Sequence, residues 1–136
     1  MAENVFVLDA CALIAVLRGE PGEDRVLEVL AEPESRVLMH VLNLCEVYYD
    51  ALRRDSETTL SELLESVATL GVELVHDLGV PLVEQAGRIK AERRRVSLAD
   101  CVGLATALEA QGLLLTTDHH ELDALAEDGL PIRFVR

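Results

Sequence analysis

Four acidic residues occupy positions where carboxylates could act together on one ligand. Asp9 directly follows a continuous apolar run at residues 4–8, and Asp118 follows the apolar segment 113–116. Glu46 and Asp100 each have largely apolar neighbours. Converging carboxylates repel one another and lose hydration, so proteins retain them where a cation holds them together. An oxygen-only ligand set suits Mg²⁺ or Mn²⁺ better than zinc or copper.

Each acid taken singly also has a plain structural explanation. Asp9 and Asp118 could each cap the helix that follows it. The segments 43–46 (Asn-x-x-Glu) and 97–100 (Ser-x-x-Asp) have the spacing of a capping box, in which an acid reaches back to an unpaired backbone N–H. The joint pattern favours a site, because a strand-end Asp, a helix Glu, a helix-start Asp and a second strand-end Asp all lie on elements that can face one cleft.

Alternating apolar strands and amphipathic helices predict an α/β domain, with parallel strands connected through crossover helices. The predicted strands cover residues 4–8, 36–39, 72–76, 113–116 and 132–135. The predicted helices cover residues 10–18, a segment after Pro21, 42–54, 56–70, 80–95, 98–110 and a short segment after Asp118. Ligands of open α/β sheets bind beyond the carboxyl ends of the strands, where Asp9 and Asp118 are expected. No linker or internal repeat divides the sequence, so we expect a single domain over residues 1–136.

The composition limits the classes of protein to which this sequence can belong. A chain of 136 residues that is 50% hydrophobic can bury a core without disulfides or a structural metal. Its three cysteines (Cys11, Cys45 and Cys101) are widely spaced and lack a CxxC pair, and we expect them to pack as small buried hydrophobic residues beside the acids. No apolar run approaches the roughly 20 residues of a membrane span, and no signal peptide is recognisable, so a soluble, cytoplasmic protein is expected.

The charge is strongly acidic, with 25 Asp and Glu against 12 Lys and Arg and a formal net charge of −13. This excludes affinity for nucleic acid through bulk positive charge. Basic residues gather in segment 88–95, which is ordinarily a solvated helix face but is also the place where a phosphate could meet several cations. GxGxxG, GxxxxGK[ST] and GxSxG motifs are missing, so dinucleotide, P-loop and serine-hydrolase chemistry lack their usual signatures.

The sequence resembles a known family. The segments VFVLDACALIA, NLCEVYYDALRR and SLADCVGLATALEAQGLLLTTD, with acids in the order Asp, Glu, Asp, Asp, resemble the PIN-domain nucleases, and more narrowly the VapC-type toxin ribonucleases of prokaryotic toxin–antitoxin pairs. The resemblance spans nearly the whole chain and implies a three-layer α/β/α sandwich with a central, mainly parallel sheet. It implies that the metal ligands are Asp9, Glu46, Asp100 and Asp118, and that Thr116 orients an acid or a water molecule.

The same resemblance implies an activity and partners. The activity is that of an endoribonuclease, in which one or two Mg²⁺ or Mn²⁺ ions activate water to cleave RNA. The residues expected to guide the RNA backbone are Arg53, Arg54, Arg88, Lys90, Arg93, Arg94 and Arg95. Two partners are implied: an antitoxin whose basic segment covers the acidic pocket, and a second copy in a homodimer formed through helices. Where relatives often have Ser or Thr, this chain has Cys11, which puts a hydroxyl contribution at that position in doubt.

Alternatives remain open at this stage. An apolar stripe on predicted helix 56–70 (Leu60, Leu63, Leu64 and Val67) fits dimerisation, but burial in the protein's own core explains it as well. A catalytically silent PIN-like module that acts only by binding is disfavoured because all four acids are present. A phosphate-transfer α/β domain also places Asp after its first strand. A phosphatase of that kind has a second Asp where Cys11 stands, and a receiver has a lysine beyond a late strand, whereas the only lysine, Lys90, lies in a predicted helix.

Overall fold

The computed structural model describes residues 4–136, except for the side chain of Glu121. The strands are β1 (Asn4–Leu8), β2 (Ser35–His40), β3 (Glu73–Val75), β4 (Leu113–Thr116) and β5 (Ile132–Phe134). The helices are α1 (Ala10–Arg18), α2 (Glu23–Ala31), α3 (Val41–Arg54), α4 (Leu60–Leu70), α5 (Val80–Glu92), α6 (Leu98–Glu109) and α7 (His119–Glu127). Within residues 4–136, none of the helices has the length and apolar content needed to cross a bilayer.

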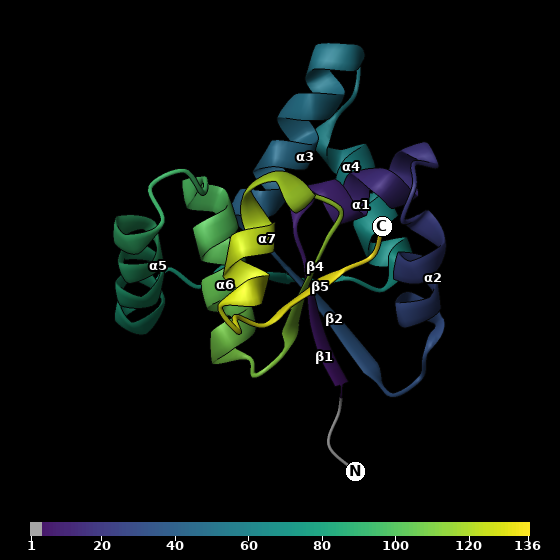
Figure 1. The fold of residues 1–136 in the computed structure, drawn as a ribbon. Helices are drawn as coiled ribbons and strands as arrows, with labels where there is room; N and C mark the ends of the chain where they lie inside the picture. Colours follow the sequence, from purple (N-terminus) through teal and green to yellow (C-terminus); the bar gives the residue numbers. More distant parts are fainter. Residues whose placement is uncertain (1–3) are drawn as a thin grey trace.

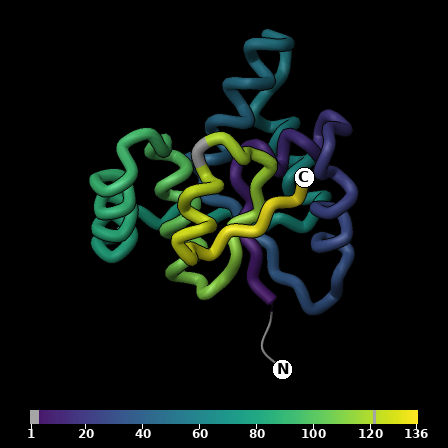
Figure 2. Tube along the Cα trace, viewed as in Figure 1, coloured from purple at the N-terminus to yellow at the C-terminus, as the bar shows by residue number. Residues whose placement is uncertain are grey.

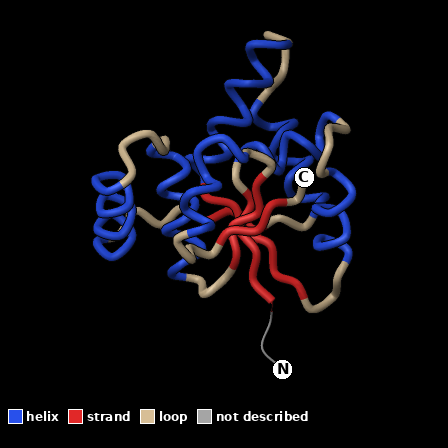
Figure 3. Tube along the Cα trace, in the orientation of Figure 1, coloured by secondary structure: helices blue, strands red, loops and turns tan. Residues whose placement is uncertain are grey.

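The five strands form one parallel sheet in the order β3-β2-β1-β4-β5. Successive side chains of a strand point to opposite faces, so Phe6 and Leu8 join one apolar core and Val7 joins the other. Helices α1 to α4 contribute to the first core and α5 to α7 to the second. Figures 1 and 3 show the sheet between helices on both sides. The predicted three-layer α/β/α sandwich is confirmed.

Parallel pairing brings the carboxyl ends of the strands to one edge of the sheet. Strand β1 lies between β2 and β4, so the beginning of the chain pairs with a strand formed more than a hundred residues later, as the trace in Figure 2 shows. Asp9 follows β1 at this edge, His40 ends β2 and Thr116 ends β4. The backbone N–H of Asp9 donates to the carbonyl oxygen of Leu115 at 3.2 Å, which extends the β1–β4 ladder to the acid.

Helix α6 is the most deeply enclosed of the helices. Every residue from Cys101 to Ala107 is buried, against α5 on one side and the sheet on the other. A helix that is apolar nearly all round belongs in a protein interior, so its start is held firmly in place. The first turn of this helix contains Asp100.

Most predicted boundaries agree with the structure to within one residue at each end. Helix α4 is an exception: it begins at Leu60, four residues after the predicted start. Residues 55–59 form a turn instead, because the Thr59 hydroxyl accepts a hydrogen bond from the backbone N–H of Glu62 at 3.1 Å and so caps the helix.

Helix α5 is the second exception, because it ends at Glu92 and leaves residues 93–95 in the loop before α6. Arg93 has a non-helical backbone, with φ −127° and ψ 69°. The Lys90 amine donates to the carbonyl oxygens of Arg94 and Val96 at 2.7 Å each, so it satisfies backbone groups that a continuing helix would have paired. The basic run is therefore divided between a helix and a loop.

Gly112, in the turn between α6 and β4, allows the backbone to pass close to β1. A Cβ at this position would lie 2.5 Å from the carbonyl oxygen of Val5. Gly112→Ala should therefore lower the free energy of unfolding by about 1–3 kcal/mol, since the backbone of the turn and that of β1 have to separate. Gly87→Ala on α5 is the matched control, because a Cβ there has nothing within 4 Å. It should raise stability by up to about 1 kcal/mol. Urea unfolding measures both, and equal stabilities would contradict the close approach.

Candidate active site

Asp9 is the most confined of the four acids. Its side chain is 1% exposed, and Oδ1 accepts a hydrogen bond from the backbone N–H of Ala12 at 2.8 Å, which caps α1. Burial raises the pKa of Asp9 to about 7; repulsion from Asp100 and Asp118 adds to this, while hydrogen bonds from Thr116 and Ala12 oppose it. The predicted cap is therefore correct, and the same carboxyl is also part of a charged cluster.

Thr116 connects the ends of the two central strands. It is fully buried at the end of β4. Its hydroxyl oxygen accepts from the backbone N–H of Asp118 at 3.0 Å, and the hydroxyl hydrogen-bonds the Asp9 carboxylate. Asp118 in turn caps α7, since its Oδ1 accepts from the backbone N–H of His120 at 2.8 Å. One hydroxyl thus fixes Asp9 and the backbone of Asp118 relative to each other.

Glu46 lies in α3 and is half-buried. Burial is the largest cause that raises its pKa; repulsion from Asp100 adds to it, and a hydrogen bond from the Tyr49 hydroxyl opposes it. Its Oε1 atom is buried and has no hydrogen-bond partner among the described groups. A buried carboxylate oxygen without a donor is costly, and a cation would satisfy it.

The segment 43–46 is not a capping box, which corrects the sequence interpretation. Helix α3 begins at Val41, and its cap is His40, whose Nδ1 accepts from the backbone N–H of Leu42 at 3.1 Å. Asn43 is therefore inside the helix, where it is fully buried. Its amide donates to the carbonyl oxygen of Ala99 at 3.1 Å. Asn43 thus ties the helix of Glu46 to the first turn of the helix of Asp100, a role that the sequence did not indicate.

Ser97 caps α6, as the second capping-box spacing predicts. Its hydroxyl oxygen accepts from the backbone N–H of Asp100 at 3.1 Å. This bond fixes the backbone at Asp100 at the N-terminal end of α6. The Asp100 carboxylate is close enough to raise the pKa of both Asp9 and Glu46.

The pKa of the Cys11 thiol depends on all four acids, Asp9, Glu46, Asp100 and Asp118, which together form the carboxylate cluster. Its pKa is raised to about 12, first by partial burial and then by repulsion from four carboxylates. In order of decreasing effect these are Asp9, Asp118, Asp100 and Glu46. All four predicted ligands therefore lie near enough to Cys11 to raise the pKa of its thiol. The packing expectation for the cysteines is correct for Cys101, which is buried, and wrong for Cys11 and Cys45, which are exposed.

The donor set fits a hard divalent cation, because it consists of carboxylate oxygens that repel one another and one of them, Glu46 Oε1, is buried without a donor. Among the described side chains, no group of three or more His, Cys, Asp or Glu residues is arranged to hold an ion as the side chains stand. The donor types of these four acids therefore suit a cation, whereas the described side chains do not surround one common position.

Four of the seven predicted RNA-guiding residues are engaged within the protein. Arg54 pairs with Asp50 at 3.0 Å and Arg88 with Glu84 at 3.1 Å, each across one helical turn. Arg93 pairs with Asp128, and the Lys90 amine is held by backbone carbonyls. Within the described part of the chain, which leaves out the Glu121 side chain, Arg53, Arg94 and Arg95 have no ion-pair or hydrogen-bond partner.

Comparisons with known proteins identify the fold. The family model for the PIN domain matches residues 6–128. No curated protein sequence matches the chain. A solved toxin–antitoxin complex from Klebsiella pneumoniae is similar with a TM-score of 0.71 and 17% identity, over 96% of this chain and 97% of the other.

Two further solved structures are similar over almost their full length. DNA-bound VapBC from Salmonella typhimurium has a TM-score of 0.68 and 18% identity, over 98% of this chain and 99% of the other. VapBC-5 from Mycobacterium tuberculosis has a TM-score of 0.59 and 23% identity, over 97% of this chain and 98% of the other. At these identities the likeness shows a shared fold.

The raised pKa of Asp9 makes the stability of the metal-free protein depend on pH. The carboxyl titrates near 3.8 in the unfolded chain and at about 7 in the folded one, so the folded chain binds the proton more tightly. The stability contributed by the protonated form is complete below about pH 4 and is lost as pH rises through 7. Asp9→Asn cannot ionise and keeps the Oδ1 acceptor. It should match the wild type near pH 4 and exceed it by about 2–4 kcal/mol at pH 8.

Urea unfolding in EDTA at the two pH values tests this prediction. Glu65→Gln, at an exposed position of α4, is the control and should differ from the wild type by less than about 0.5 kcal/mol at both. If the wild type is as stable as Asp9→Asn at pH 8, the pKa of Asp9 is not raised by folding, and the prediction is wrong.

Proposed function

The chain belongs to the PIN domain family, and from that premise we propose that it is a divalent-metal-dependent endoribonuclease that serves as the toxin of a toxin–antitoxin pair. The main support is that Asp9, Glu46, Asp100 and Asp118 lie in one region at the carboxyl edge of the sheet, near enough to Cys11 for each to raise the pKa of its thiol. The similar solved structures include toxin–antitoxin complexes, which agrees with the proposed biological role.

The four acids are the residues that would hold Mg²⁺ or Mn²⁺. One carboxylate oxygen of Glu46 has no hydrogen-bond donor among the described groups, and burial disfavours the charged form of Asp9. A bound cation would stabilise both carboxylates. When bound, the ion supplies a lowered pKa for the attacking water and charge stabilisation for the scissile phosphate and the leaving 3′ oxygen. Because no set of three ligands is gathered among the described side chains, we expect carboxylates to rotate as an ion binds.

The chain's own residues would hold this cluster in place during cleavage. Asp9 is fixed by the Ala12 N–H and the Thr116 hydroxyl, so it is the stationary member. Thr116 orients Asp9 and Asp118 together, and Asn43 holds the Glu46 helix against the Asp100 helix. Hydrolysis at the 3′ oxygen leaves a 5′ phosphate and does not use the 2′ hydroxyl, so no histidine base is required.

Partner binding belongs to the same proposal. We propose an antitoxin whose basic segment lies over the carboxylate cluster, because a cationic side chain would relieve the same repulsion as a metal ion. We also propose a homodimer. In the stripe on α4, Leu63 and Val67 are buried in the core, whereas Leu60 and Leu64 are exposed and line a groove of about 300 Å³ with Tyr48. Burial in the protein's own core therefore explains two residues of the stripe, and the other two are available for a dimer contact.

The alternatives differ in what they predict. Membership of the PIN family argues against the phosphate-transfer domain. A catalytically silent interaction module would bind a partner and leave RNA intact, with or without metal, so the cleavage experiment separates it from the nuclease.

Purified protein should cleave single-stranded RNA with Mg²⁺ or Mn²⁺ and should not do so in EDTA. Asp9→Asn and Asp100→Asn should each lower the cleavage rate by about a hundredfold or more, because each removes a proposed ligand. Glu65→Gln should cleave like the wild type. Mn²⁺ should also raise the melting temperature of the wild type more than that of either Asn variant, since an ion that binds the folded state stabilises it. Undiminished cleavage in EDTA would refute the proposal.

Light scattering at micromolar concentration tests the dimer. The wild type should have about twice the 14.9 kDa of one chain. Leu60→Gln combined with Leu64→Gln should give a monomer that stays folded, because both side chains are exposed in the single chain. Leu27→Gln removes a similarly exposed leucine on α2 and should leave the dimer intact. A wild-type protein that is wholly monomeric would exclude this interface.

A further inference from the structure

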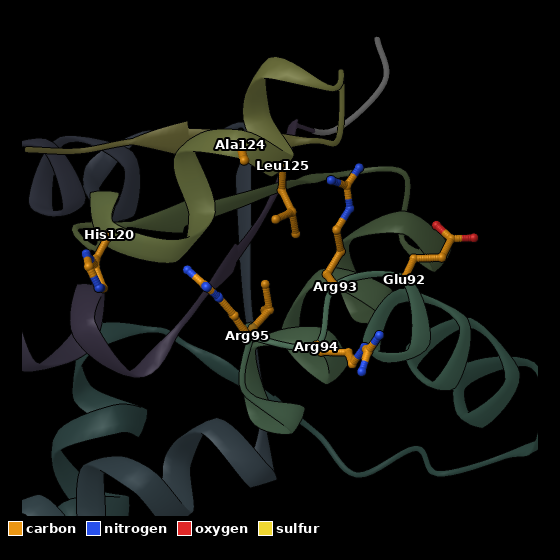
Figure 4. A pocket seen from close by; sticks show the side chains of 8 residues that line it. Glu92, Arg93, Arg94, Arg95, His120, Ala124 and Leu125 are labelled. Carbon is orange, nitrogen blue, oxygen red and sulfur yellow. The ribbon is translucent and has the colours of Figure 1, made fainter.

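A cleft lies between the α5–α6 loop and helix α7. It has a volume of about 400 Å³ and is lined by residues 92–96 on one side and by His120, Ala124 and Leu125 on the other (Figure 4). Both walls lead directly to the carboxylate cluster. The loop continues into α6, whose first turn contains Asp100, and α7 is capped by Asp118. The cleft therefore lies next to the proposed site. Basic side chains predominate among the charged groups of its lining, whereas the proposed site consists of carboxylates.

His120 is the link between the two regions. Besides the cleft, it lines a second hollow of about 390 Å³, together with Cys11 and Asp118. A ligand that extends from the carboxylate cluster past His120 would enter the cleft. A polymer with regularly spaced charges has this kind of reach, because one charge can lie at the cluster and another in the cleft.

The loop wall is held in shape by two of its basic residues. The Lys90 amine donates to the carbonyl oxygens of Arg94 and Val96, and the buried Val96 side chain anchors the loop in the core. Arg93 pairs with Asp128 just after α7, which ties the loop to the opposite wall. The positive groups of Lys90 and Arg93 are thus occupied inside the protein, and their contribution is to position the loop.

Arg95 is different, because it is exposed and has no ion-pair or hydrogen-bond partner among the side chains and backbone groups that the structure describes. Figure 4 shows its side chain extending toward His120, whereas the neighbouring Arg94 extends away from it. A guanidinium presents several N–H donors in one plane, which matches the oxygens of a phosphate group. The loop thus directs one unpaired cation into the cleft.

We propose that this cleft binds one backbone phosphate of the RNA substrate, with Arg95 as the contacting residue opposite His120 and with Lys90 and Arg93 as positioning residues. The inference rests on the proposed function in that the ligand is the RNA that the carboxylate cluster would cleave. It gives a strongly acidic protein a local means of holding a polyanion, since affinity for phosphates depends on the few cations that touch them.

Equilibrium binding tests the cleft separately from catalysis. The probe is a fluorescently labelled single-stranded RNA, and its anisotropy is measured in EDTA between about 50 and 200 mM salt. Arg95→Gln should weaken binding about tenfold at the lowest salt and reduce the slope of log affinity against log salt by about 0.7, the value for one phosphate contact on a single strand. Arg25→Gln, at an exposed position of α2 away from the cleft, is the matched control and should change binding less than twofold.

A phosphate contact carries no sequence information, so the weakening by Arg95→Gln should be equal on two RNAs of different sequence. It should also be equal on a single-stranded DNA of the same sequence as one of them. A loss confined to one sequence would show that Arg95 contacts a base, and would overturn the proposal.

The positioning role of Lys90 has its own readout. Lys90→Met should weaken binding in the wild-type background and have little further effect when combined with Arg95→Gln, because it acts through that residue. Arg93→Gln provides a second variant of the same kind should Lys90→Met fail to fold. Additive losses in both double variants would mean that these groups act as independent charges, which contradicts the assigned roles.

The two proposals can fail independently. A wild type that cleaves RNA with Mg²⁺, together with an Arg95→Gln variant that binds RNA as the wild type does at every salt concentration, would refute the cleft and keep the nuclease. An equal loss in Arg25→Gln and Arg95→Gln would also refute the cleft, because it indicates diffuse attraction. A wild type that shows the Arg95-dependent binding but never cleaves would keep the cleft and refute the nuclease.

Discussion

The burial of carboxyl groups at the carboxyl edge of the sheet, together with the repulsion between them, is the constraint on which the rest of the site depends. Asp9 cannot move away from it, because the α1 cap and the Thr116 hydroxyl hold the side chain in the interior. Asn43 keeps the helices of Glu46 and Asp100 together in the same region. Carboxyl groups that are more stable when protonated or bound to a cation are therefore held in place by rigid helices and strands. The fold keeps them close together at a cost in free energy that a bound cation would lower.

The parts of the site that follow from local sequence were predictable. An apolar run that stops at an acid predicts a buried strand with the acid at its end, and this describes both Asp9 after β1 and Asp118 two residues beyond β4. The Ser97 spacing predicts the start of α6 correctly because a cap depends on only a few neighbouring residues. The alternation of strands and helices was sufficient for an α/β fold with parallel strands, whereas the three-layer sandwich was expected from the family resemblance.

The parts that depend on distant contacts were not predictable. Asn43 has the spacing of a cap, but its partner is Ala99, on a different helix, and no local pattern shows that bond. The basic run at 88–95 has a helical composition throughout, yet Lys90 bonds to carbonyls further along and the helix ends at Glu92. This difference decides which arginines are unpaired, so the electrostatics of the surface follow from tertiary structure and not from the count of charges.

The central place of β1 in the sheet has a consequence for the order of synthesis. Strand β1 pairs with β4, and the whole segment from residue 9 to residue 112 lies between them in the chain. A partly synthesised chain therefore has Asp9 and Glu46 but lacks Thr116 and Asp118, and its first strand has an unpaired edge. The set of acids is assembled only after β4 and Asp118 have been synthesised, so a chain that has not reached Asp118 does not contain the complete carboxylate cluster.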